Sequence, residues 1–113
     1  MTQAMLNTKL YQKMFAEQEL FKAELMLLPP VEVLDKAYEY LCREDILMAL
    51  EYNNLSSRQA LALLKSPTPL ADVFQKWDGW EENHHLEKIW NAVEARANEV
   101  VRANFIESRR DAR

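Results

Sequence analysis

The sequence predicts an all-α fold, a compact single-domain bundle of five or six helices with a long C-terminal helix. Strong helix formers dominate its 113 residues. The β-branched residues are few, with six Val, three Ile and three Thr, and never alternate as in a strand. The single glycine, Gly79, leaves little material for hairpin turns and rules out glycine-rich nucleotide loops. One domain is expected over residues 1–113, with 1–6 and 109–113 frayed.

A first helix is expected from Asn7 or Thr8, either of which can cap it, to Leu28. It should end there because a residue that precedes proline is pushed out of helical geometry. Apolar residues recur at intervals of three, four and seven positions. They predict one buried face, made of Leu10, Met14, Phe21, Leu25 and Leu28.

Pro30 suits the first position of a second helix, where its missing N–H has no intrahelical partner. This helix should reach about Tyr52, before Asn53 and Asn54 stop it. Its predicted buried face comprises Leu34, Ala37, Tyr38, Leu41, Ile46, Leu47 and Leu50. The pattern leaves open whether it is one helix or two that join near Arg43.

Ser56 and Gln59 have the spacing of a reciprocal capping box, so a short third helix should run to about Lys65. Thr68 and Pro69 predict the cap and first residue of the next helix, which should stop at Asp78-Gly79. Its apolar face is expected to hold Leu70, Val73, Phe74 and Trp77.

The last helix is expected from about Trp80 to Ser108, with acids early and arginines late, as the helix dipole favours. Its predicted apolar face comprises Leu86, Trp90, Val93, Ala97, Val100 and Val101. We expect Phe74, Trp77 and Trp90 to fill the core. Trp80 and Tyr40 lie off the main apolar stripes, so they are predicted as exposed contact rings.

The charge pattern indicates a basic partner. Residues 17–51 hold nine acids and three bases, whereas residues 96–113 hold five arginines and three acids, within a net charge of -4. This balance disfavours broad attachment to nucleic acid or to an anionic membrane. We therefore expect a protein partner, contacted by the residues Glu39, Tyr40, Glu44, Asp45 and Trp80.

Signals for other compartments and for cofactors are weak. The only cysteine, Cys42, cannot form an intramolecular disulfide, which fits a cytoplasmic protein. Its helical apolar context favours a small buried hydrophobe over a nucleophile. The N-terminus lacks the features of a secretory signal, and the longest apolar run, residues 25–28, is far shorter than the ~20 residues of a membrane span. No cofactor, no catalytic residue and no membrane partner are expected.

Two alternatives remain open at this point. Arg102, Arg109 and Arg113 fall near one face of the last helix and could contact phosphates, as in a nucleic-acid-binding regulator. His84 and His85 follow Glu81 and Glu82 at Glu-x-x-His spacing, which carboxylate-bridged metal enzymes use. Such a site needs a second Glu-x-x-His, which the sequence lacks, so an ordinary solvated first turn is the preferred interpretation.

Five segments together carry a family resemblance: Leu10-Tyr11-Gln12-Lys13-Met14, Ala37-Tyr38-Glu39-Tyr40, Arg43-Glu44-Asp45-Ile46-Leu47, Gln59 to Pro67, and Pro69-Leu70-Ala71-Asp72-Val73. From about Leu10 to Arg96 the chain resembles small proteins of unknown function carried on conjugative and other mobile elements of gut anaerobic bacteria. The resemblance implies no chemistry and no catalytic residue. It implies a setting in which accessory proteins often inhibit host defence enzymes.

Charge and setting together lead to a functional hypothesis. We expect a non-enzymatic protein-binding module, a mobile-element accessory protein that inhibits a host defence nuclease of the kind that anti-CRISPR or anti-restriction proteins block. An acidic helical domain suits the basic nucleic-acid channel of such an enzyme.

Overall fold

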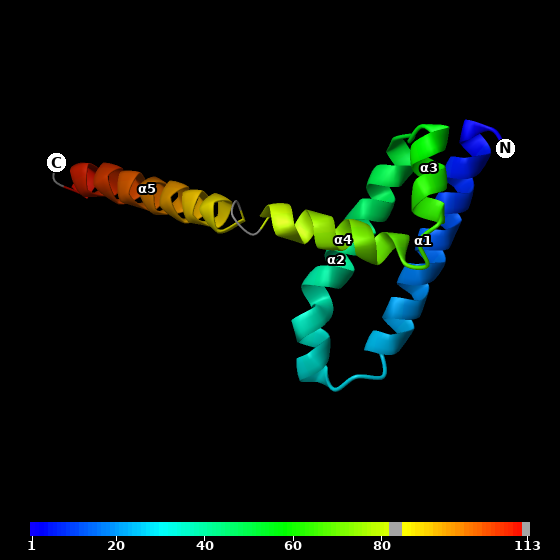
Figure 1. Cartoon of the computed structure of the whole chain (residues 1–113). Helices are drawn as coiled ribbons and strands as arrows, with labels where there is room; N and C mark the ends of the chain where they lie inside the picture. Colours follow the sequence, from blue (N-terminus) through cyan, green and yellow to red (C-terminus); the bar gives the residue numbers. More distant parts are fainter. Residues whose placement is uncertain (82–84, 112–113) are drawn as a thin grey trace. The chain divides into compact units, whose positions relative to one another are not determined.

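All regular elements in the described part of the structure are helices. The computed structural model describes residues 1–81 and 85–111, and for residues 79–81, 85 and 111 it describes the backbone alone. These residues form five helices and no strand (Figure 1). The helices are α1 (Gln3–Leu25), α2 (Pro30–Tyr52), α3 (Ser57–Leu64), α4 (Pro69–Glu81) and α5 (His85–Asp111). The predicted all-α class and long C-terminal helix are confirmed.

The contacts within the chain divide it into two units, Met1–Trp77 and Asp78–Arg113. The predicted compactness of the bundle is therefore not found. The physical reason lies in α5, where every described side chain, from residue 86 to residue 110, is exposed. Trp90, expected in the core, is 59% exposed, and Val101 is 67% exposed.

The first helix begins earlier than predicted. The Thr2 side chain accepts a hydrogen bond from the N–H of Met5 at 3.2 Å, so Thr2 is the N-cap of α1. Residues 3–6, which were expected to fray, belong to α1, and Leu6 lies in the core. The side chain of Asn7 does not cap the helix; it bonds the backbone N–H and C=O of Leu55, at 2.9 Å each.

Fraying was also expected over residues 109–113, and of these the helix α5 includes Arg109, Arg110 and Asp111. Arg113 lies outside the described residues.

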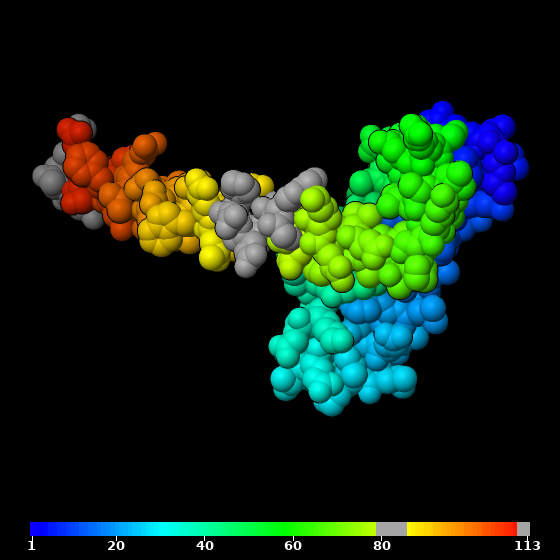
Figure 2. Space-filling view, in the orientation of Figure 1, coloured from blue at the N-terminus to red at the C-terminus, as the bar shows by residue number. Residues whose placement is uncertain are grey.

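Helices α1 and α2 form an antiparallel hairpin whose turn lies at the end of the first unit opposite to the N-terminus (cyan in Figures 1 and 2). The backbone N–H groups of Leu27 and Leu28 bond the carbonyls of Glu24 and Leu25, which closes α1 three residues before the predicted end. Pro30 begins α2 as predicted, and α2 continues through Arg43 as one helix.

The capping box of α3 is confirmed. The Ser56 side chain accepts from the N–H of Gln59 at 3.1 Å, and the Gln59 side chain accepts from the N–H of Ser56 at 3.0 Å. Helix α4 runs through Gly79 to Glu81, past its predicted stop, and no glycine in the described part has a positive φ. Gly79 therefore does not end the helix.

The core of the first unit lies where α1 packs against α2 and α3. It consists of Leu6, Leu10, Met14, Leu47, Ala60 and Leu70. The predicted α1 face is confirmed at Leu10, Met14, Phe21 and Leu25, which are buried, whereas Leu28 follows the helix and is half-buried. Phe74 of α4 is buried as expected, whereas Trp77 is 39% exposed.

The buried face of α2 agrees only in part with the predicted one. Leu47 is buried, and Ala37, Ile46 and Leu50 are half-buried, as expected. Leu34 and Leu41 were also expected inside, but they are 74% and 61% exposed, whereas Arg43 is only 7% exposed. The buried side of the helix is therefore shifted toward Arg43, which Glu17, Glu39 and the ring of Phe21 hold inside.

Candidate functional site

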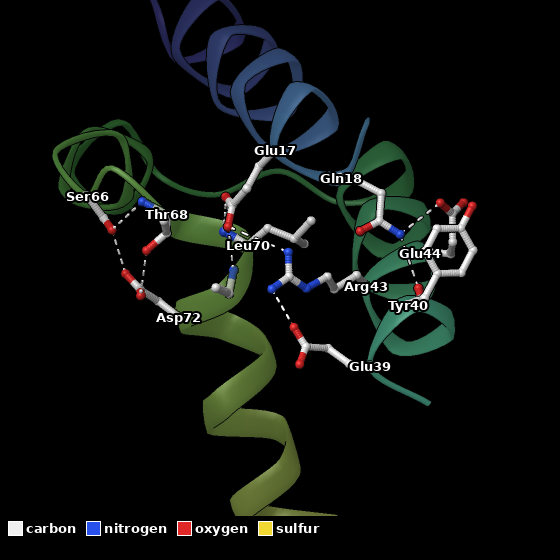
Figure 3. A network of polar contacts seen from close by, with 11 residues as sticks. Glu17, Gln18, Glu39, Tyr40, Arg43, Glu44, Ser66, Thr68, Leu70 and Asp72 are labelled. Carbon is white, nitrogen blue, oxygen red and sulfur yellow. Dashed lines mark hydrogen bonds and ion pairs between the residues drawn. The ribbon is translucent and has the colours of Figure 1, made fainter. Parts of the chain in front are cut away.

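Arg43 is the centre of a polar network that joins α1 and α2 (Figure 3). Its guanidinium donates to the carboxylate of Glu39, lies 3.9 Å from that of Glu17, and stacks 4.1 Å above the ring of Phe21. Two anions and an aromatic face thus surround the cationic plane, while its buried Nε has no hydrogen-bond partner. Because Arg43 and Glu17 are both largely buried, we assign this network to holding α2 against α1.

Glu17 also caps the start of α4. Its two carboxylate oxygens accept hydrogen bonds from the N–H groups of Leu70, at 2.8 Å, and Ala71, at 2.9 Å. These donors belong to the first turn, where no intrahelical acceptor exists and negative charge is favourable. Thr68, the predicted cap, instead donates its hydroxyl to Asp72 (Figure 3). The cap therefore comes from another helix, about fifty positions away in the sequence.

A second buried polar group of α1, Gln18, holds the other side of α2. Its amide donates to the backbone carbonyl of Tyr40 at 3.1 Å and to the Glu44 carboxylate at 3.0 Å (Figure 3). Three of the predicted partner-binding residues, Glu39, Tyr40 and Glu44, thus take part in internal contacts. Glu39 and Tyr40 are half-buried, while Glu44 and Asp45 are exposed.

A cleft of about 360 Å³ lies beside this network, between α1 and the start of α4. Three of its four charged lining residues are engaged with the protein. Lys13 donates to the backbone carbonyls of Leu64 and Ser66, at 2.9 and 2.6 Å, and Glu17 and Arg43 make the contacts described above. The fourth, Glu24, is exposed. We therefore assign the cleft to the packing of α4 against α1.

The exposed side of α2 has a different character. Six residues recur there at alternate spacings of four and three, which places them along one line on a helix. We call this line the outer stripe; it consists of Leu34, Tyr38, Leu41, Asp45, Met48 and Tyr52. All six are exposed, with Met48 at 57% and Tyr52 at 80%. Tyr38 borders α4 through an edge contact with Phe74, whose centroid is 6.2 Å away.

Acidic residues line the outer stripe. Asp45 lies at its centre, and Asp35, Glu44 and Glu51 lie at exposed positions directly beside it. The two bases of α2, Lys36 and Arg43, are seven residues apart and lie on the opposite side of the helix. The outer stripe is therefore an apolar row in a field of negative charge.

One acid of this field also connects α2 to α1. The hydroxyl of Tyr11 donates to the Glu51 carboxylate at 2.8 Å, and this hydrogen bond is the main cause that raises the pKa of Tyr11 above 10.0; burial and the Glu51 charge add to it. The folded chain holds the phenol proton more tightly than the unfolded chain. The resulting stabilisation is complete below pH 10.0 and is lost as the pH rises through the folded-state pKa.

We predict that Glu51→Gln lowers the pKa of Tyr11 toward its ordinary value, because a neutral amide stabilises the phenol form less than a carboxylate does. The measurement is an ultraviolet phenolate titration, in which the Tyr11→Phe variant is subtracted to isolate this ring from the other tyrosines. A Tyr11 midpoint that Glu51→Gln leaves unchanged would contradict the assignment.

The remaining predicted site residues lie in the second unit or at its border. Trp80 lies in the helical backbone of α4, and its side chain is outside the described part. Arg102 and Arg109 are exposed on α5, and Arg109 lies 5.6 Å above the ring of Phe105. Arg113 and His84 lie outside the described residues, and so does the side chain of His85.

Sequence reasoning missed Glu17, Gln18 and the outer stripe as a surface. Asp45 was the available signal for the stripe, because a charged residue in the middle of an apolar line argues against burial of that line. Among the described residues, no three His, Cys, Asp or Glu side chains are gathered so that they could hold a metal ion. Nor does that part of the chain contain a helix with the length and apolarity to cross a membrane.

Comparison with known proteins gives a family match. A family model described as a protein of unknown function, DUF3848, matches residues 6–101. No curated protein and no solved structure matches the chain.

Proposed function

The chain belongs to the DUF3848 family, and we propose that it is a non-enzymatic module that binds a protein partner through the outer stripe of α2. The observation that carries the proposal is the exposure of large apolar side chains along the whole of this helix. Leu34, Leu41, Met48 and Tyr52 are each more than half exposed. Contiguous apolar surface rimmed by polar groups is typical of protein interfaces.

The charge of the surface defines the partner. Asp45 lies within the outer stripe and Glu44 beside it, so both of these predicted contact residues keep that role. Glu39 and Tyr40 support the surface from within, through Arg43 and Gln18. Because complementary potentials favour encounter and register, the partner surface should be basic around an apolar centre.

We further propose that the partner is a host defence nuclease and that the chain is an accessory protein of a mobile element. Support comes from charge alone: a nuclease carries a basic channel for its nucleic-acid substrate, and an acidic apolar helix can occupy it. Inhibition would then follow from exclusion of the substrate.

The test is capture from host lysate with the tagged full-length chain, followed by mass spectrometry. We expect a partner with a basic surface, and its capture should be lost in the Glu44→Arg, Asp45→Arg double variant. Glu19→Arg is the matched control, since Glu19 is an exposed acid of α1 away from the outer stripe. Equal capture by all three proteins would refute the proposed surface.

A gel-shift series over increasing salt separates this function from the alternative of a nucleic-acid-binding regulator. Binding through Arg102 and Arg109 should weaken steeply with salt, because phosphate contacts release counterions. Such binding, lost in an Arg102→Ala, Arg109→Ala variant, would favour the regulator.

A further inference from the structure

We infer that the occupant of the outer stripe is a basic amphipathic α-helix that lies along α2 and sets a lysine or arginine opposite Asp45. The inference rests on the proposed function and names the structural element and chemistry that this surface takes.

The spacing of the outer stripe carries the first step. Its alternate steps of four and three residues are those of the apolar seam of a coiled coil, with Leu34, Leu41 and Met48 at one seam position and Tyr38 and Tyr52 at the other. From Leu34 to Tyr52 the row is about 27 Å long at 1.5 Å per residue. A helix that packs alongside at about 20° follows such a row over its whole length, which a single loop does not.

Asp45 occupies the central seam position, so it would be enclosed when a helix packs on the outer stripe. An ionised carboxylate enclosed between apolar side chains is costly unless a charged donor pairs with it. The occupant must therefore supply a cation at the same level. A polar pair within an apolar seam also fixes the register of the two helices.

The acidic residues beside the seam indicate that the occupant is basic, and they exclude a second copy of α2. Asp35, Glu44 and Glu51 lie at the flanking positions, where coiled coils place the charges that select a partner. Two copies of α2 would oppose acids with acids, without a compensating base. A helix with lysines or arginines at its own flanking positions matches all three acids.

The test uses two synthetic helical peptides of 21 residues, titrated into the full chain by calorimetry. Both have leucine at the seam and lysine at the flanks; one has lysine and the other leucine at the level of Asp45. We expect the lysine peptide to bind about tenfold more tightly than the leucine peptide. A tenfold ratio corresponds to about 1.4 kcal/mol for the charged pair with Asp45. The Asp45→Leu variant should reverse this preference.

Matched leucine variants show whether the peptide lies on the outer stripe. Leu41→Ala should weaken binding, whereas Leu61→Ala should leave it unchanged, since Leu61 is an exposed leucine of α3. Absence of binding by either peptide, or a preference that Asp45→Leu leaves intact, would overturn the inference. The inference would also be overturned if the chain formed dimers and the Asp45→Arg variant were monomeric. The occupant of the outer stripe would then be a second copy of the chain.

The outcomes separate the inference from the function on which it rests. A natural partner that is captured through Glu44 and Asp45, but is not displaced by the lysine peptide, would retain the proposed function and overturn the helical occupant. Loss of both the captured partner and the peptide complex would refute both.

Discussion

Replacement of Arg43 by alanine should lower the free energy of unfolding by about 3 kcal/mol, because it removes the cation from a buried ionic group. Arg43 is nearly enclosed, and without it the Glu17 carboxylate, whose side chain is 13% exposed, keeps its hydrogen bonds to α4 but has no cation beside it. The substitution also uncovers the face of Phe21, above which the guanidinium lies at 4.1 Å. Charge, hydrogen bonding and ring contact are lost together.

Urea unfolding, followed by circular dichroism, measures this effect. Arg58→Ala is the matched control, since Arg58 is exposed on α3, and it should change stability by no more than about 0.5 kcal/mol. Arg43→Lys should recover only part of the loss, because an ammonium lacks the planar fork that reaches Glu39 while it stacks on a ring. An Arg43→Ala variant as stable as Arg58→Ala would show that the network adds nothing.

The same residue explains why one part of the fold could be predicted and another could not. The capping box at Ser56 and the first-turn proline at Pro30 depend on neighbours in the sequence, so local reasoning placed both helix starts correctly. The orientation of α2 depends instead on Glu17 and Gln18 of another helix. Apolar periodicity assigns leucine to the core and arginine to water. In α2 this holds for Leu47 but fails for Leu34, Leu41 and Arg43.

The candidate site shows the same division. The acidity of the region was evident from composition, and Asp45 was correctly expected at an exposed position. Glu39 and Tyr40 were expected at a contact surface too, but Arg43 and Gln18 draw them inward. The exposed leucines could not be recognised as surface, because an apolar stripe that binds a partner has the same pattern as one that binds the core.

Helix α5 adds a further case. The predicted long C-terminal helix is present, but it runs from His85 to Asp111 and begins later than the predicted start near Trp80. Periodicity cannot supply the element that covers an apolar face, and the described side chains of α5, residues 86–110, are all exposed. An amphipathic pattern therefore predicts a helix and the face that it buries. It does not identify the element that packs against this face.

Replacement of Glu17 by alanine should lower the free energy of unfolding by about 3 kcal/mol, because each of two buried N–H donors loses a charged acceptor at a cost of about 1 to 3 kcal/mol. The donors are Leu70, which is fully buried, and Ala71. Glu17→Gln should recover part of the loss, since one amide oxygen can accept while the amide nitrogen faces the other donor. Glu19→Ala, an exposed acid of the same helix, should leave stability nearly unchanged.

Amide hydrogen exchange distinguishes loss of the cap from general destabilisation. In the Glu17→Ala variant, the amides of Leu70 and Ala71 should exchange faster relative to core amides of α1, because the start of α4 loses its acceptor. Combination with Arg43→Ala tests the connection between the two sites. Since Glu17 and Arg43 share one ion pair, the double variant should lose less than the sum of the single losses. Strict additivity would mean that Glu17 acts on α4 alone and that the 3.9 Å approach of Arg43 carries no coupling.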